Sequence, residues 1–223
     1  MFEYKNIEII VKFDEELNLP FVIHNHKNLY FPEFYTVDKV ITDYRALLTE
    51  QDIRASHRYV KSYNELTDKT LLDIGSAEGI FALDTIEFVK EVIIFECEQY
   101  WLKPLKATFE PWKDKVRFVE KYVGNITSGK FITIDEFLKD YPKENLFLKM
   151  DIEGAERKAL EGAINTLQSS KNIQLAICTY HQPNDPEYIA DFVSNFGFEY
   201  EFSDGLMYWE KRFSKGLIRC YKA

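Results

Sequence analysis

The chain of 223 residues is 46% hydrophobic and 16% aromatic, enough for one domain with a sizeable core, and its formal net charge of −9 argues against a general nucleic-acid or anionic-membrane binder. Its three cysteines are scattered and form no C-x-x-C pair, which argues against a disulfide framework and favours a reducing, cytoplasmic setting. We expect no signal peptide, and no apolar run approaches the ~18 residues of a membrane span.

The N-terminal residues 1–65 are rich in phenylalanine and tyrosine but contain no glycine. Residues 8–13 are predicted as a short strand and residues 28–36 as a loop or sheet edge. Apolar residues repeat with a helical period over residues 37–48, and residues 52–64 are predicted as a second helix. We expect an α-rich cap that shapes a substrate pocket, with aromatic rings available to stack on a sugar, although most of the rings are expected to pack in the core.

Two polar pairs in this segment are candidates for binding. His24 and His26 form an H-x-H pair that would share one face of a strand, but no carboxylate or thiol lies at a ligand spacing, so we expect no metal there. His57 and Arg58 precede the glycine turn described next, and either could reach a carboxylate of a ligand bound there. A solvated helix face is the alternative, and it is favoured for Arg58.

The turn at residues 73–79 is the feature around which the chain is predicted to be organised. An apolar run ends in an acid and is followed by Gly75, Gly79 and an amphipathic segment, an order that predicts a buried strand, a tight turn and a helix over residues 80–89. Gly75 has no side chain, so a ligand can approach the backbone there. Ala77 replaces the middle glycine of the dinucleotide pattern G-x-G-x-x-G, which disfavours a nicotinamide-dependent oxidoreductase.

A second apolar run, residues 91–95, predicts a parallel strand that ends at Glu96. Glu96 follows Asp73 by about twenty residues, the interval at which an acid of a βαβ unit binds a ribose. Glu98 is the alternative ribose ligand, since it shares the same strand face. An interaction of Glu96 with the dipole of the following helix is the purely structural explanation.

The next predicted strand covers residues 116–124 and alternates in polarity. Near its end, Tyr122 is expected to wall an adenine pocket or to join the core. Thr133 and Glu136 fit a capping box at the start of a helix that stops before Pro142.

Two further buried strands end in residues that can carry chemistry. Residues 146–150 run into Asp151 and then Glu153, and residues 175–180 run into His181. Because the carboxyl ends of parallel strands meet at one edge of a sheet, we expect these side chains to face the same crevice as the glycine turn.

The remaining elements complete an α/β fold. A helix is predicted to start with Asp185 as its N-cap, and residues 198–202 and 217–221 are predicted as an antiparallel edge pair. The alternation of strands and helices predicts a doubly wound, mostly parallel sheet. We expect a cap at residues 1–65 and a cofactor-binding domain at residues 66–223.

Over roughly residues 70–200 the chain resembles the FkbM-type family of S-adenosylmethionine (SAM)-dependent methyltransferases. The resemblance is carried by D-I-G-x-x-x-G at 73–79, I-F-E at 94–96, T-I-D-E-F-L at 133–138, K-M-D-I-E-G-A-E at 149–156 and a strand ending in His181. That family usually has Asn at the position of Ala77 and Pro at the position of Cys97. These departures concern one SAM contact and the start of the following helix.

The resemblance implies a class I, Rossmann-like methyltransferase that uses SAM and methylates a hydroxyl of a sugar or of a glycan or secondary-metabolite precursor. The expected cofactor-binding residues are Asp73, Gly75, Ser76, Gly79, Glu96 and Tyr122. A small-molecule or glycan acceptor is expected, and no nucleic acid. A SAM- or partner-binding module without catalysis is the alternative.

A hydroxyl is a weak nucleophile, so O-methylation benefits from a general base. Asp151 and His181 are predicted to form the proton-accepting unit, because they follow two buried strands and histidine titrates near neutral pH. Glu153 is predicted to assist or to replace them. The three residues could also hold Mg²⁺, but acids at strand ends are common without a metal, so no metal is predicted.

Overall fold

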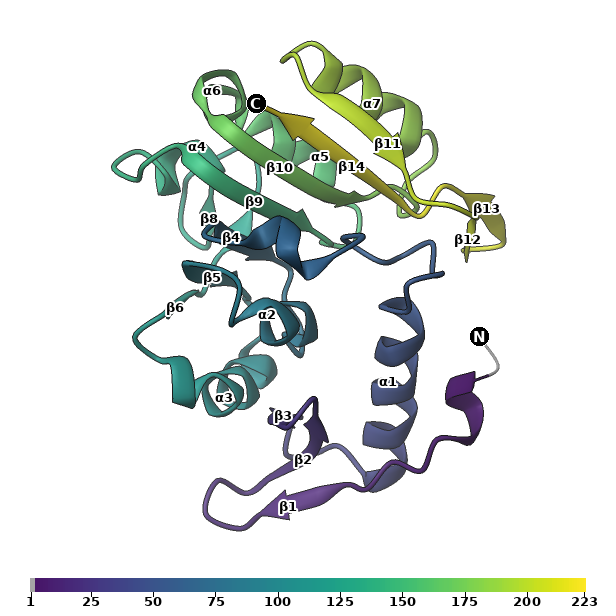
Figure 1. Cartoon of the computed structure of the whole chain (residues 1–223). Helices are drawn as coiled ribbons and strands as arrows, with labels where there is room; N and C mark the ends of the chain where they lie inside the picture. Colours follow the sequence, from purple (N-terminus) through teal and green to yellow (C-terminus); the bar gives the residue numbers. More distant parts are fainter. Residues whose placement is uncertain (1–2) are drawn as a thin grey trace.

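The computed structural model describes residues 3–223, and its centre is one seven-stranded sheet with the order β11-β14-β10-β9-β4-β5-β6 (Figure 1). The strands are Thr70–Ile74 (β4), Glu91–Phe95 (β5), Val116–Val119 (β6), Glu144–Met150 (β9), Lys171–Cys178 (β10), Glu199–Phe202 (β11) and Leu217–Lys222 (β14). The predicted doubly wound, mostly parallel sheet is confirmed. Met1 and Phe2, which belong to the predicted cap, lie outside the described residues.

The direction of the strands fixes where a ligand can bind. The chain runs outward from β4 through β5 to β6 and then returns to β9, on the other side of β4. This reversal makes the loops after β4 and β9 a topological switch point, the usual ligand crevice of an open α/β sheet. The predicted antiparallel pair is present, with β14 inserted antiparallel between β10 and the edge strand β11.

The central strands of the sheet are buried on both faces, which explains why they are mainly apolar. On β4, Leu71 belongs to one hydrophobic cluster and Leu72 to the other, as the alternation of a strand requires. The first face is covered by α1 (Val37–Glu50), α2 (Ile80–Thr85) and α3 (Gln99–Thr108). The second is covered by α4 (Ile134–Phe137), α5 (Glu156–Glu161), α6 (Ile164–Ser169) and α7 (Asp185–Ser194).

The N-terminal region is a mixed structure and not the α-rich cap that the sequence predicts. It forms a three-stranded antiparallel sheet of β1 (Lys12–Asp14), β2 (Leu19–His24) and β3 (Lys27–Tyr30), followed by the predicted helix α1. The strand expected at residues 8–13 therefore starts later, and the segment expected as loop begins as β3. A short 3-10 helix, η1 (Glu3–Asn6), precedes this sheet.

The predicted helix at residues 52–64 is wrong, because this segment forms successive turns that end in the 3-10 helix η2 (Tyr63–Leu66). Side chains satisfy the backbone groups that a helix would have paired. The carboxylate of Asp52 accepts from the backbone N–H of Arg54, and the guanidinium of Arg58 donates to the carbonyls of Gln51 and Val60. Such local bonds compete with helix formation.

The two histidines of the H-x-H pair do not share a strand face. Asn25 and His26 both have positive φ angles and form the tight turn between β2 and β3. His24 ends β2 and is buried, with Nδ1 at 2.9 Å from the hydroxyl of Tyr44 and Nε2 at 2.8 Å from a carboxylate oxygen of Asp84. These bonds tie the small sheet to α1 and α2.

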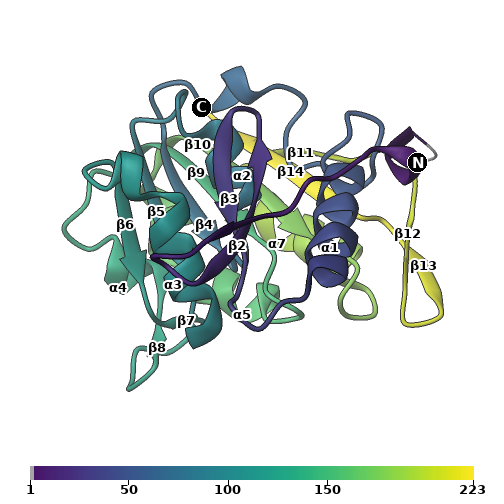
Figure 2. The same cartoon turned by 90° about the horizontal axis from the view of Figure 1, so that it is seen from below.

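The N-terminal sheet is part of the main body of the fold. Val22, Leu29 and Phe31 are buried in the same cluster as Phe81 of α2 and Leu105 of α3. Figure 2 shows the small sheet and α1 on the same side of the central sheet as α2 and α3. Removal of residues 1–36 would therefore expose core, so that deletion does not isolate a substrate-selecting function.

Several short elements differ from the sequence prediction. The strand expected at residues 116–124 splits, because Tyr122–Val123 (β7) pairs with Phe131–Ile132 (β8) outside the main sheet. The helix expected at residues 80–89 ends at Thr85 and is buried on all sides. The 3-10 helix η3 (Glu110–Trp112) follows α3.

The helix ends also differ in detail. Thr133 caps α4 by accepting from the N–H of Glu136, but its own N–H donates to the hydroxyl of Thr127 instead of completing the predicted box. Asn184, and not Asp185, is the N-cap of α7. Asp185 instead accepts from the N–H of Gln182.

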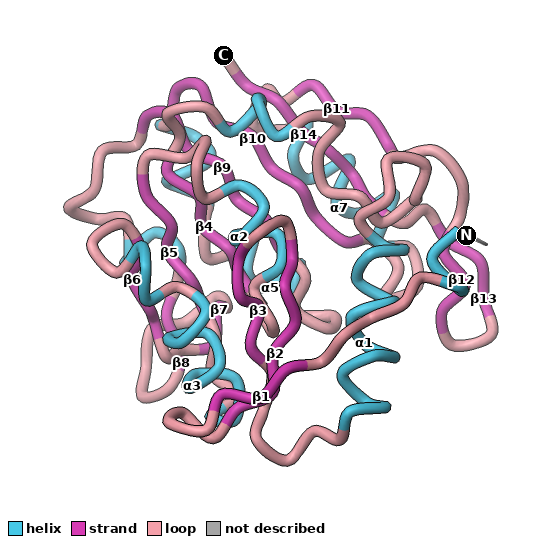
Figure 3. Tube along the Cα trace, turned by 60° about the horizontal axis from the view of Figure 1, so that its bottom comes forward, coloured by secondary structure: helices cyan, strands magenta, loops and turns pink. Residues whose placement is uncertain are grey.

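The hairpin of β12 (Met207–Trp209) and β13 (Arg212–Ser214) was not predicted, because its strands are short and mostly exposed. Figure 3 shows it as a separate ribbon beside the central sheet. Across the described residues 3–223, no helix is long and apolar enough to span a bilayer.

Candidate active site

Two cavities meet at Gly75, at the switch point of the sheet. The larger has a volume of about 310 Å³ and lies beyond the ends of β4 and β5, and the smaller has about 60 Å³ and lies under the C-terminal end of α1. The larger is lined by residues that include Gly75, Phe95, Glu96, Tyr122, Phe131 and Ile152. The smaller is lined by residues that include Leu47, Glu50, Tyr59, Gly75, Glu78, Lys149 and Asp151.

The glycines of the predicted turn are required by packing. Gly75 has a φ of +77°, and a Cβ there would lie 2.0 Å from the carbonyl oxygen of Asp151. Gly79 has a φ of +76°, and its Cβ would lie under 3.0 Å from atoms of Leu105 and Phe109. Besides the predicted close approach of a ligand, Gly75 is thus needed for the contact between the loops after β4 and β9.

Asp73 and Ser76 hold the turn together. The buried carboxylate of Asp73 lies 3.0 Å from Nζ of Lys149 and accepts a 2.7 Å hydrogen bond from the hydroxyl of Ser76. Lys149 also donates to the carbonyl of Gly75. The charges of Asp73 and Asp151 keep the pKa of Lys149 above its ordinary value although burial alone would lower it. These side chains fix the backbone that lines both cavities.

Glu96 occupies the predicted place at the end of β5 and lines the larger cavity. One carboxylate oxygen accepts from the N–H of Ala77 at 2.9 Å, and the other accepts from the N–H groups of Cys97 and Glu98 at 2.8 Å. Each oxygen of a carboxylate can accept further bonds. Glu98 instead accepts a 3.2 Å bond from the hydroxyl of Tyr122, which lines the same cavity.

Asp151 is the centre of a polar cluster beside the smaller cavity. Its Oδ2 accepts a 2.8 Å hydrogen bond from the hydroxyl of Tyr59 and lies 3.4 Å from Nε2 of His57. Its Oδ1 lies 3.6 Å from Nε2 of His181. Burial would raise the pKa of Asp151, but the bond to His57 and the charges of His57, Lys149 and His181 hold it well below its ordinary range.

His181 lies three residues beyond the end of β10, and not on the strand as predicted. Its Nδ1 lies 2.8 Å from a carboxylate oxygen of the buried Glu156. Burial would lower the pKa of His181, but the hydrogen bond to Glu156 and the charges of Glu156, Asp151 and Glu153 raise it overall. The predicted convergence of Asp151 and His181 is thus present.

Glu153 reaches the same cluster from the loop after β9. Its φ is +53°, and its Oε2 lies 3.6 Å from Nε2 of His181 while most of its side chain is exposed. Burial raises the pKa of Glu153, opposed by the charge of His181.

Sequence reasoning missed Tyr59, Glu50 and Glu78, and it left His57 open. His57 is buried, with Nε2 at 3.1 Å from the hydroxyl of Tyr180 as well as near Asp151. Burial raises the pKa of Glu78 to about 8 and also raises the pKa of Glu50. The loop at residues 51–62 carries no periodic signal, so only the histidine itself could have drawn attention.

A third cavity of about 590 Å³ adjoins the cluster. It lies between α1 and residues 204–207 and is lined by residues that include Thr42, Thr49, Ser56, His57, Glu50 and Leu206. Glu50 also lines the smaller cavity, so the three cavities follow one another through Gly75 and Glu50.

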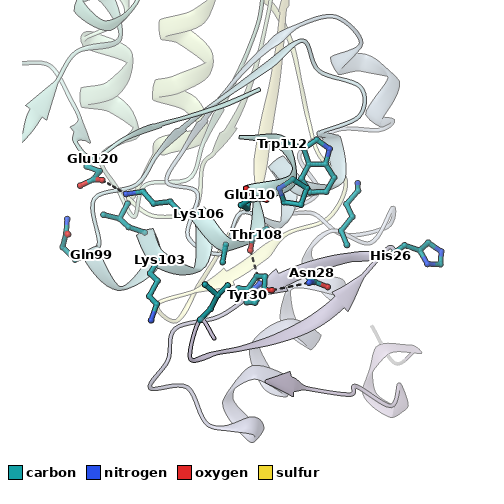
Figure 4. A pocket seen from close by; sticks show the side chains of 15 residues that line it. His26, Asn28, Tyr30, Gln99, Lys103, Lys106, Thr108, Glu110, Trp112 and Glu120 are labelled. Atoms are coloured by element: carbon teal, nitrogen blue, oxygen red, sulfur yellow. Dashed lines mark hydrogen bonds and ion pairs between the residues drawn. The ribbon is translucent and has the colours of Figure 1, made fainter. Parts of the chain in front are cut away.

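The largest cavity, about 910 Å³, lies elsewhere, between the N-terminal hairpin and α3 (Figure 4). Lys106 points to Glu120 in this view, and its Nζ lies 3.1 Å from Oε1 of Glu120. The backbone N–H of Tyr30 donates to the hydroxyl of Thr108. Lys103 pairs with Glu33 at 3.3 Å. No residue lining this cavity also lines the three that surround the switch point, so it is separate from the candidate active site.

The sheet order and the cavities at its switch point define a class I methyltransferase fold. Residues 104–200 match the family model of the Methyltransferase FkbM domain, which confirms the predicted resemblance to the FkbM-type methyltransferases. The match begins after the glycine turn, so residues 70–103 of the predicted resemblance lie outside it. A search of curated proteins finds no match to this sequence.

Solved structures agree with this fold. The FkbM methyltransferase from Methylobacillus flagellatus KT superposes with a TM-score of 0.56 at 20% identity, covering 82% of this chain and 54% of that one. The magnesium protoporphyrin IX methyltransferase from Synechocystis PCC 6803, solved with bound SAM, superposes with a TM-score of 0.52 at 10% identity, covering 85% of this chain and 86% of that one. This chain thus spans about half the length of the Methylobacillus protein. The domain match over residues 104–200 and the fold both agree with the predicted resemblance to methyltransferases.

Proposed function

We propose that this protein is a SAM-dependent O-methyltransferase that acts on a hydroxyl of a sugar or a related small polar molecule. The observation that carries the proposal is that neighbouring cavities share the lining residues Gly75 and Glu50. A space lined by the strand-end acid Glu96 leads, past Gly75, to a cluster in which Asp151 lies between two histidines, His57 and His181. Cofactor site and proton-accepting groups therefore adjoin.

The residues around the first two cavities fit SAM. The carboxylate of Glu96 can accept from ribose hydroxyls, and Tyr122 offers an aromatic wall for adenine. Glu50 and Glu78 line the smaller cavity, where the cationic methionyl half of the cofactor would favour their ionised forms. When bound, SAM supplies a methyl group made electrophilic by its sulfonium.

The protein's own task is to place the acceptor hydroxyl, exclude water and remove a proton. Asp151 can orient either histidine, because His57 lies near its Oδ2 and His181 near its Oδ1. Tyr59 donates to Oδ2 and so holds the carboxylate in place. We assign the proton-accepting role to this unit, with Glu153 at its solvent side.

The third cavity is the proposed acceptor site. It adjoins His57 and carries the hydroxyls of Thr42, Thr49 and Ser56, which suit a polar acceptor of modest size. Among the described residues that line it, none is Phe, Tyr or Trp. The expectation that N-terminal aromatics stack on a sugar thus gains no support from this cavity.

The test has a binding part and a turnover part. Isothermal titration of the full chain with SAM, S-adenosylhomocysteine and NAD should show binding of the first two only. Transfer of radiolabelled methyl from SAM to a panel of sugars and nucleotide sugars should then identify the acceptor. NAD binding would favour the oxidoreductase alternative, and SAM binding without transfer to any hydroxyl compound would favour a non-catalytic module. A cytoplasmic location is part of the proposal, supported by the few scattered cysteines, and the acidic net charge supports the absence of a nucleic-acid partner.

A further inference from the structure

Three potential ligand atoms surround a gap beside Asp151. Oδ1 of Asp151, Oε2 of Glu153 and Nε2 of His181 all lie within 4.8 Å of one another. Both carboxylate oxygens are 3.6 Å from Nε2, which is too long for a hydrogen bond. Two ligand atoms that share one metal ion are separated by such a distance, since each lies 2.0–2.2 Å from a small divalent ion.

The imidazole of His181 is aimed into this gap without a partner. Its side chain is 3% exposed, and Nε2 is buried with no hydrogen-bond partner. A buried polar atom without a partner is rare and calls for an explanation such as an ion. This observation is independent of the two acids.

The other ring nitrogen is held as metal-binding histidines require. Nδ1 of His181 lies 2.8 Å from Oε1 of Glu156, which is itself buried and accepts a 3.0 Å bond from the N–H of Ile152. A carboxylate bound to the remote nitrogen fixes the tautomer of a metal-ligating histidine and directs the lone pair at the metal. Glu156 would be this positioning residue.

The conformation of the loop is consistent with the same role. Glu153 adopts a left-handed φ of +53°, uncommon for a residue with a side chain, and Gly154 follows with a φ of +97°. This turn brings a largely exposed glutamate back toward the strand ends. Oδ2 of Asp151 already accepts a hydrogen bond from Tyr59 and lies close to His57. Oδ1 is therefore the oxygen of Asp151 that remains for a metal ion.

We propose that Asp151, Glu153 and His181 form a binding site for one divalent cation of the Mn²⁺ or Mg²⁺ class. Two carboxylates and one imidazole leave coordination positions for the acceptor, and Mn²⁺ accepts both oxygen and nitrogen ligands. The proposal rests on the proposed function for its role, which is to bind the acceptor hydroxyl and make it more acidic.

The proposal separates the roles of the two histidines. His181 gives its free lone pair to the metal, so it cannot accept a proton, and His57 takes the proton of the acceptor hydroxyl. The C–S bond of SAM breaks as the C–O bond forms, and its electron pair remains on sulfur in S-adenosylhomocysteine. The products are the methyl ether and protonated His57.

The direct test measures the metal without turnover. The purified full chain is stripped with EDTA, and binding of Mn²⁺ is followed by electron paramagnetic resonance. One site is expected. Glu153→Gln, at a mostly exposed side chain, should weaken Mn²⁺ binding by tenfold or more, while the matched control Glu187→Gln, an exposed acid on α7, should not. Glu156→Gln keeps a hydrogen-bond acceptor for His181 and should weaken binding by about 10–100-fold.

Activity gives a second, separable result. Chelation should abolish methyl transfer, with restoration by Mn²⁺ or Mg²⁺, and leave SAM binding intact. Absence of Mn²⁺ binding at millimolar concentration, or equal affinity in Glu153→Gln and Glu187→Gln, overturns the metal site and leaves His181 as an imidazolium held by three carboxylates. Full transfer after chelation also overturns it while the proposed function stands. Mn²⁺ binding in a protein that does not bind SAM overturns the proposed function alone.

Discussion

The two halves of the candidate active site are built in different ways. On the side of β4 and β5, the backbone N–H groups of Ala77, Cys97 and Glu98 donate to the carboxylate of Glu96, so this half is held together within the segments 73–79 and 94–98. On the side of β9 and β10, the groups are buried side chains from distant parts of the chain, such as Tyr59, Asp151 and His181. The first half is thus built from two short segments that are close in the sequence, whereas the second half exists only once the tertiary structure has formed.

The largest effect should come from the turn that joins the two halves. Gly75→Ala places a Cβ 2.0 Å from the carbonyl of Asp151, so we expect a loss of about 4 kcal/mol or more in unfolding free energy and no SAM binding. Gly197→Ala is the matched control, because Gly197 has a similar φ of +78° in open space and should cost only about 1 kcal/mol. Chemical denaturation measures both. Equal losses would mean that backbone strain, and not the contact between the halves, makes Gly75 necessary.

The second effect should be confined to the side of β9 and β10. Asp151→Asn removes the negative charge that lies beside the two histidines, so kcat should fall by about 10²–10⁴-fold while SAM affinity changes little. The kcat of His57→Ala should fall in the same range. The kcat of the double variant should be little lower than that of the poorer single variant, since the effects of residues that act as one unit are not additive. Steady-state kinetics and titration with SAM provide the two readouts. Unchanged kcat in Asp151→Asn would remove it from the proton-accepting unit.

The third effect should be confined to the side of β4 and β5. Glu96→Gln keeps only one of the two oxygens that accept from backbone N–H groups and loses the charge. We expect SAM affinity to fall by about tenfold or more, since bonds to charged groups contribute ~1.5–3 kcal/mol. Glu98→Gln is the control at the alternative position. If Glu98→Gln weakens SAM binding more than Glu96→Gln does, the ribose assignment moves to Glu98.

The smallest effect concerns Glu78, a half-buried acid between the halves. Burial raises the pKa of Glu78 to about 8, so the folded protein keeps a proton that the unfolded chain loses above about pH 4.5. The free energy of unfolding therefore falls as the pH rises from about 4.5 to about 8. Glu78→Gln should therefore raise Tm by a few degrees at pH 8 and leave it unchanged at pH 4. Thermal unfolding across this range measures the difference, and a uniform change at every pH would contradict it.

The same comparison explains what the sequence could reveal. The central strands are mainly apolar runs with turn residues after them, so their positions along the chain and the crevice were predictable. The place of Glu96 at the end of β5 and the convergence of Asp151 with His181 were predictable for the same reason. His57 and Tyr59 could not be placed, because they lie in a loop whose path is set by single side chains such as Arg58. The hairpin at residues 207–214 was missed because exposed three-residue strands leave almost no periodic pattern.

Glu50 at the end of α1 has implications for the order in which substrates bind. It lines both the 60 Å³ and the 590 Å³ cavity, and the former is too small for the methionyl half of SAM unless the end of α1 moves. That movement also reshapes the wall of the acceptor cavity. We therefore expect an ordered sequential mechanism in which SAM enters first, so that S-adenosylhomocysteine, the last product to leave, inhibits competitively against SAM and non-competitively against the acceptor.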